Sequence, residues 1–116
     1  MAVSKTRIGR EGEELAARHL REMGYEILER NWRFGHKEID LICVDGDYIV
    51  FVEVKARSDT EHGLPAESVT PQKIRYLRMA AEMYLQKTGN TESFCRFDVV
   101  EVYLSDGFVR HIADAF

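Results

Sequence analysis

The sequence contains few residues that could stabilise a fold covalently or through a structural metal. Only two cysteines, Cys43 and Cys95, occur among 116 residues, and both lie in apolar, strand-like segments. We therefore expect two small buried side chains rather than a disulfide or a redox pair. The cysteines and the four histidines also lack the spacing of a zinc site. A chain of this length can bury a sufficient core without either device.

Long apolar runs and a basic composition are also missing. No apolar stretch approaches the roughly 20 residues that a membrane-spanning helix needs, and the first seven residues lack the apolar core of a signal peptide. We therefore expect a cytoplasmic protein without membrane contact. The formal net charge of −4 at pH 7 argues against a protein that coats nucleic acid through a basic surface.

Hydrophobic periodicity and turn signals divide the chain into helices and strands in a definite order. The pattern predicts one helix at residues 9–23 and another that begins at Pro71, with Thr70 as its N-cap, and ends before Gly89. Strands are predicted at residues 25–34, 38–44, 48–56, 94–104 and 108–112, with a loop at 57–69. An antiparallel meander followed by a helical crossover predicts an α/β fold with a mixed central β-sheet flanked by helices. Without a linker or repeat, we expect one domain over residues 1–116.

Four charged side chains lie inside strands that are otherwise apolar. Glu38 and Asp40 alternate along one predicted strand, and Glu53 and Lys55 alternate along the next. Alternation places each pair on one face of its own strand. The flanking residues are too apolar for a half-solvated edge, so these charges need a reason to be there. The simpler alternative is an exposed hairpin face with ordinary ion pairs.

The turn between these two strands predicts how the charges face each other. Asp45-Gly46 is typical of a two-residue type I′ hairpin loop, which would pair Val44 with Asp47. All four charged side chains would then project from one face, with Glu38 opposite Glu53 and with Asp40 diagonal to Glu53.

Two carboxylates in one partly buried place indicate a divalent cation, because each carboxylate is costly to desolvate and repels the other. Oxygen ligands favour Mg²⁺ or Mn²⁺. Lys55 could orient or deprotonate an attacking water, or stabilise charge on a phosphate, and these are the functions that phosphodiester hydrolysis requires.

Two further positions are candidates for the same chemistry. Glu13 shares the core-facing stripe of the first predicted helix, so we expect it to meet the metal site or Lys55; the alternative is a position at the helix edge. Gln72 and Lys73 lie in the first turn of the second helix, where unpaired N–H groups and the helix dipole favour an anion. A phosphate or carboxylate would compensate Lys73 there.

Together these residues resemble the PD-(D/E)XK nuclease superfamily, with Asp40 as the motif aspartate and Glu53-Val54-Lys55 as the E-x-K motif. More narrowly, the chain resembles the YraN family of small bacterial proteins (UPF0102 type), thought to be related to archaeal Holliday-junction resolvases. Ile39 replaces the motif proline, and Lys37 replaces a usual glycine. The narrower resemblance covers almost the whole chain and rests on the segments Gly9-Arg10-Glu11-Gly12-Glu13, Gly24-Tyr25, Asn31-Trp32-Arg33, Glu38-Ile39-Asp40-Leu41-Ile42, Phe51-Val52-Glu53-Val54-Lys55-Ala56-Arg57 and Val69-Thr70-Pro71-Gln72-Lys73.

The resemblance implies a restriction-endonuclease-like αβββαβ core and a Mg²⁺- or Mn²⁺-dependent endonuclease acting on DNA, with branched junctions among its substrates. It implies catalytic residues at Asp40, Glu53, Lys55 and Glu13, metal ligands at Asp40, Glu53 and Val54, and nucleic-acid contacts at Arg10, Arg33, Arg57, Gln72 and Lys73. The alternatives are a nucleic-acid-binding module with weak or no catalysis in a larger complex, and a protein–protein adaptor. The sequence leaves open whether the protein is a monomer or a homodimer.

Overall fold

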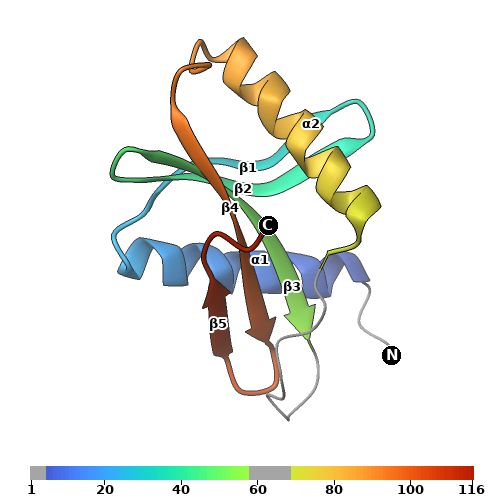
Figure 1. Ribbon diagram of the computed structural model, residues 1–116. Helices are drawn as coiled ribbons and strands as arrows, with labels where there is room; N and C mark the ends of the chain where they lie inside the picture. Colours follow the sequence, from blue (N-terminus) through green and yellow to red (C-terminus); the bar gives the residue numbers. More distant parts are fainter. Residues whose placement is uncertain (1–4, 58–68) are drawn as a thin grey trace.

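The computed structural model describes residues 5–57 and 69–116. Most of the predicted loop at 57–69, and the first four residues, lie outside the described residues. The predicted order of elements is confirmed (Figure 1): α1 (Lys5–Glu22), β1 (Glu26–Phe34), β2 (Lys37–Asp45), β3 (Tyr48–Arg57), α2 (Pro71–Lys87), β4 (Phe94–Tyr103) and β5 (Phe108–Ile112).

The strands form one mixed sheet in the spatial order β1-β2-β3-β4-β5. β1, β2 and β3 pair antiparallel as consecutive strands. The crossover through α2 brings β4 parallel to β3, and β5 then returns antiparallel to β4. The prediction of an α/β fold with a restriction-endonuclease-like core is confirmed by this order and by the mixed sheet.

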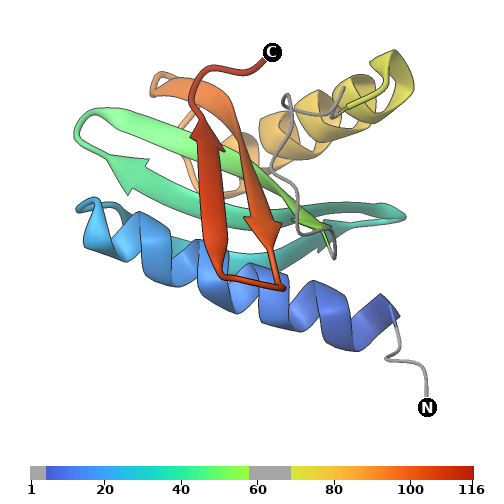
Figure 2. The same cartoon turned by 90° about the horizontal axis from the view of Figure 1, so that it is seen from below.

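The two helices cover opposite faces of the sheet, as Figure 2 shows. Each face holds its own apolar cluster, so the molecule has two cores separated by the sheet. On the α1 side the cluster comprises Ala16, Ala17, Leu20, Tyr25, Leu41, Cys43, Val50, Val52, Val100 and Val102. On the α2 side it comprises Ile39, Ile42, Ile49, Phe51, Leu77, Ala80, Ala81 and Tyr84, with Trp32 packed against them. Full burial of each large aliphatic side chain stabilises the fold by about 1.5–3 kcal/mol.

A glycine allows α1 to approach the end of β3 closely. A Cβ atom at Gly12 would lie 2.9 Å from the Cβ of Ala56, closer than real Cβ atoms pack. The neighbouring residue along the helix is Glu13, so this close packing carries an acidic side chain toward the carboxyl-terminal end of β3.

α2 begins as the sequence predicts. The Thr70 Oγ1 accepts a hydrogen bond from the N–H of Lys73 at 3.2 Å, and Pro71 occupies the first helical position. The cap fixes the first turn of α2, and with it Gln72 and Lys73, beside the sheet.

The pairing of β2 with β3 differs from the prediction by two residues. Val44 pairs with Ile49 rather than with Asp47, so the hairpin loop is Gly46-Asp47 instead of Asp45-Gly46. Within that loop only Gly46 has a positive φ, of 58°, whereas a type I′ turn needs positive φ at both central residues. The predicted turn was therefore one residue too early, although it lies in the right hairpin.

The prediction for the cysteines is half correct. Both are free, and Cys43 is buried as expected. Cys95, however, is exposed near the start of β4. Neither described helix is both long and apolar enough to cross a membrane.

Candidate active site

The regular pairing of β2 is interrupted at Asp40. On one side, pairing with β1 skips Asp40 and Asn31; Asn31 has a φ of 51°, a left-handed conformation that asparagine tolerates. On the other side, the ladder with β3 ends at Leu41 and Val52. Where the strands separate, Asp40 Oδ2 accepts a hydrogen bond from the main-chain N–H of Val54 at 2.8 Å. A side chain thus takes the place of strand pairing.

The interruption also changes which face neighbouring residues occupy. Ile39 and Ile42 both pack on the α2 side, whereas Leu41 packs on the α1 side, so strict alternation fails at Asp40. Because Glu38 precedes Ile39, it lies toward the α1 side. The prediction that all four charged side chains share one face is therefore wrong for Glu38, and so is its expected position opposite Glu53.

Acidic side chains from both sides of the sheet converge on Asp40. On the α1 side, Glu13, Glu38 and Asp40 each place one carboxylate oxygen within 4.8 Å of the others. On the α2 side, Glu53 follows directly beyond the last regular strand pair, and it is only 7% exposed. The structure thus brings Glu13, Asp40 and Glu53 together, and adds Glu38.

The raised pKa values of Asp40 and Glu53 indicate that too little positive charge lies near these two carboxyl groups. Burial, followed by the charge of Glu53, raises the pKa of Asp40 to about 8, although the N–H of Val54 opposes this rise. Burial also raises the pKa of Glu53, and the nearby Lys73 and Lys55 lower it. A cation bound between the two carboxyl groups would favour the ionised form of both and would lower both pKa values.

One atom gives a direct test of whether a cation fits this place. Oε2 of Glu53 is buried and accepts no hydrogen bond from any described residue. A buried acceptor without a partner costs about 1–3 kcal/mol, and more when it is charged. The carboxylate oxygens around it are hard ligands of the kind that Mg²⁺ and Mn²⁺ take. The residues present therefore fit a divalent cation.

Lysines approach the acidic pair from two elements. Lys73, in the first turn of α2, places its Nζ 3.8 Å from Oε1 of Glu53. Glu53 is thus the carboxylate that compensates a lysine at an otherwise unfavourable helix start. Lys55 is half-buried two residues beyond Glu53 and lowers its pKa.

Several of the residues expected to contact nucleic acid have partners within the protein. Arg33 Nε lies 3.0 Å from Oε2 of Glu38, and Arg57 Nε lies 3.6 Å from Oε2 of Glu101. Gln72 donates a hydrogen bond to the hydroxyl of Tyr76 at 2.8 Å. Arg10 is exposed on α1.

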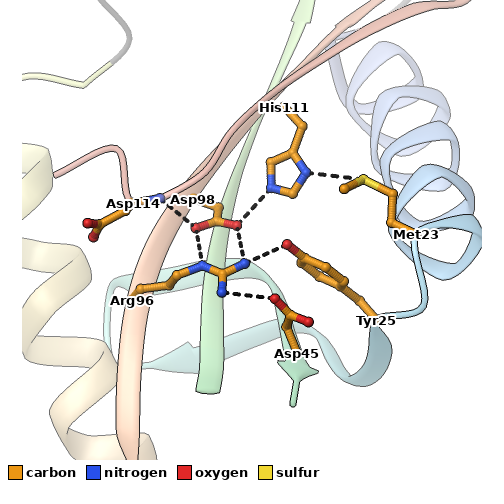
Figure 3. A network of polar contacts seen from close by, with 7 residues as sticks. All are labelled: Met23, Tyr25, Asp45, Arg96, Asp98, His111 and Asp114. Carbon is orange, nitrogen blue, oxygen red and sulfur yellow. Dashed lines mark hydrogen bonds and ion pairs between the residues drawn. The ribbon is translucent and has the colours of Figure 1, made fainter. Parts of the chain in front are cut away.

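A second polar group, which the sequence did not suggest, lies on the α1 side of the sheet (Figure 3). Arg96 donates hydrogen bonds to Asp98, Asp45 and the hydroxyl of Tyr25. His111 Nε2 lies 2.7 Å from Oδ2 of Asp98. Burial raises the pKa of Asp98, but hydrogen bonds from His111 and Arg96 outweigh burial, and the pKa is lowered overall.

The two groups differ in whether their buried acids are satisfied. Both carboxylate oxygens of Asp98 have partners, including the N–H of Asp114 at 3.0 Å, whereas Oε2 of Glu53 has none among the described residues. A satisfied network is typical of structural support, and an unsatisfied one indicates a binding site. Asp98 and Glu101 also lie inside an apolar strand, β4, so the pattern that indicates Asp40 and Glu53 in β2 and β3 is the signal that could have found them.

The sequence matches a family model described as "Uncharacterised protein family UPF0102" over residues 12–102. The chain belongs to the UPF0102 family. A UPF0102 protein of Syntrophomonas wolfei is 49% identical over 111 residues, covering 94% of this chain and 96% of the relative. UPF0102 proteins of Rhodococcus jostii and Pelotomaculum thermopropionicum are each 46% identical, the first covering 94% of this chain and 95% of the relative, the second covering all of both chains.

The predicted membership of the YraN family, of the UPF0102 type, is thereby confirmed. The UPF0102 match includes all four acids of the site, Glu13, Glu38, Asp40 and Glu53, and also Lys55 and Lys73.

Proposed function

We propose that this protein is a metal-dependent endonuclease that hydrolyses phosphodiester bonds in DNA, including branched DNA, with Mg²⁺ or Mn²⁺. The observation that supports this most is the acidic pair of Asp40 and Glu53: one buried oxygen of Glu53 lacks a hydrogen-bond partner among the described residues, and the pKa values of both acids are raised. An acidic centre flanked by lysines suits a substrate that carries negative charge and an ion that bridges the two.

Each residue of the site then has a separate task. Asp40, Glu53 and Val54 would hold the cation, with Glu13 and Glu38 adding negative charge on the α1 side. The hydrogen bond from the Val54 N–H fixes the Asp40 carboxylate, so that little order is lost on binding. When bound, the cation supplies Lewis acidity toward a phosphate oxygen. Lys55 stabilises developing charge on the phosphate or orients the attacking water.

A cleavage assay with a matched lysine variant tests this function. Lys55→Ala should lower the rate of cleavage of branched or linear DNA by about 10²–10³, while calorimetry with Mn²⁺ should show unchanged or slightly tighter metal binding. Lys87→Ala is the control, since it removes the same charge from the exposed far end of α2, and should cleave like the parent.

Two results would contradict the proposal in different ways. If Lys55→Ala cleaves as fast as the parent, the activity has another source. If the parent binds Mn²⁺ and DNA but cleaves no branched or linear substrate, the protein is a binding module. The net charge of −4 is the observation that favours this second function. An acidic chain binds nucleic acid weakly by itself, so such a module would act within a larger complex.

A further inference from the structure

A buried acid holds two arginines on the same face of the sheet as Glu53 and Lys55. Glu101 on β4 is 0% exposed. Its Oε1 lies 3.3 Å from Nη1 of Arg110 on β5, and its Oε2 lies 3.6 Å from Nε of Arg57 at the end of β3.

Strand register aligns this group with the candidate active site. Lys55 pairs with Glu101 across β3 and β4, and Glu101 pairs with Arg110 across β4 and β5. Directly paired residues of neighbouring strands point to the same face. Lys55, Glu101 and Arg110 therefore form a row across three strands, two residues beyond Glu53 along β3.

The arrangement fixes the arginines while leaving part of each accessible. A buried carboxylate is costly unless it is paired. Glu101 holds Arg110 by a hydrogen bond to Oε1 and attracts Arg57 as an ion pair, because its buried Oε2 accepts no hydrogen bond from any described residue. Arg110 also lies over the ring of Phe108, with 5.7 Å between the guanidinium carbon and the ring centroid. The Arg57 side chain remains 31% exposed and that of Arg110 20% exposed.

We propose that Arg57 and Arg110, held by Glu101, together bind one backbone phosphate of the nucleic-acid substrate, adjacent to the phosphate at Asp40 and Glu53. This inference rests on the proposed function. Guanidinium groups match phosphate oxygens with two parallel hydrogen bonds, and prior restraint lowers the entropy lost on binding. The row spans two strand spacings, about 10 Å. The substrate backbone therefore crosses the sheet from β2 toward β5 rather than following a strand.

The double variant Arg57→Gln/Arg110→Gln tests the phosphate contact. Affinity for fluorescently labelled duplex and junction DNA is measured by anisotropy at several salt concentrations, with Ca²⁺ in place of Mg²⁺. Loss of one phosphate contact should weaken binding and reduce the slope of log K against log salt concentration by about 0.9. Arg75→Gln/Arg78→Gln removes the same charge from exposed positions of α2 and should leave the slope unchanged.

Two further variants separate positioning from charge. If Glu101 were only a nearby anion, Glu101→Gln would strengthen DNA binding by removing repulsion; as the residue that positions the arginines, its loss should weaken binding. Arg57→Lys/Arg110→Lys keeps both charges and the fold but loses the paired donors, and should also weaken binding. Thermal melting checks that each variant is folded.

The outcomes distinguish this inference from the proposed function. If the parent binds DNA but the arginine double variants bind as the control does, the phosphate contact is wrong and the proposed function stands. If Glu101→Gln is folded and binds DNA more tightly, its positioning role is wrong. If the parent binds neither duplex nor junction DNA, both the inference and the proposed function are overturned.

Discussion

At the scale of single residues, burial and the charge of Glu53 raise the pKa of Asp40 to about 8. An unfolded aspartate has a pKa near 4, so between these values the native state binds a proton that the unfolded chain releases. The free energy of unfolding then falls as pH rises through this range. Glu53, whose pKa burial also raises, contributes with the same sign.

We predict that the metal-free protein is less stable at pH 8 than at pH 5, with each pH unit in this range costing up to about 1.4 kcal/mol. Asp40→Asn should flatten the profile, because the amide keeps an oxygen for the Val54 N–H and cannot ionise. Denaturant unfolding at several pH values measures both. His19, whose pKa burial lowers, acts in the opposite direction near pH 6, so the difference between parent and variant isolates the carboxyl.

Metal supplies the control for this pH profile. Saturation of the folded state with Mg²⁺ or Mn²⁺ at a hundredfold excess over Kd adds about 2.7 kcal/mol, and the gain should be larger at pH 8, where the ligands are ionised. Sodium chloride at equal ionic strength should not reproduce it. If Asp40→Asn and the parent show the same pH profile, the raised pKa does not belong to Asp40.

At the scale of elements, the close contact between α1 and β3 positions Glu13 beside Asp40. This approach depends on the missing side chain of Gly12. The same helix contains Gly9, where an added Cβ would meet nothing within 4 Å. One helix therefore offers two glycines with opposite expected responses.

We predict that Gly12→Ala destabilises the protein by about 1–3 kcal/mol, because its Cβ overlaps that of Ala56 and the helix must move. Gly9→Ala should instead stabilise it by about 0.5–1 kcal/mol, since alanine is the better helix former. Denaturant unfolding measures both. The double variant Gly12→Ala/Ala56→Gly should recover part of the loss; if it does not, close packing is not the reason for the glycine.

The elements themselves could be predicted from the sequence because periodicity and turn residues are local signals. Thr70-Pro71 alone gave the start of α2, and charges in apolar strands pointed to Asp40 and Glu53. The face of Glu38 could not be predicted, because it depends on Asn31 of another strand interrupting the alternation at Asp40. The hairpin register failed because Asp-Gly fits more than one turn, and the structure uses only one positive φ there.

At the scale of the whole molecule, stability and the candidate chemistry reside in different polar groups. The network of Arg96, Asp98 and His111 links β4, β5 and the segment after α1 (Figure 3). It could not be predicted, because its members are scattered between Tyr25 and Asp114 and meet only in the folded sheet. The candidate active site lies farther along β3, where β2 and β3 separate.

We predict that Asp98→Asn destabilises the protein by about 3–5 kcal/mol, because it removes a charge that compensates the half-buried Arg96. Metal binding by the folded variant should be unchanged. Urea unfolding measures the first effect and calorimetry with Mn²⁺ the second. A variant that stays folded but no longer binds Mn²⁺ would show that the two groups are coupled.

The interruption at Asp40 lies beside the residue that gives the protein its tryptophan fluorescence. Trp32 is the sole tryptophan in the sequence; it pairs with Ile39, the residue before Asp40, and its ring meets that of Tyr84 edge-on, 5.4 Å between centroids. All indole emission therefore originates one strand pair from the site. Events at Asp40 can be followed in the unlabelled protein, on the millisecond scale of stopped-flow mixing, without introducing a dye or a cysteine.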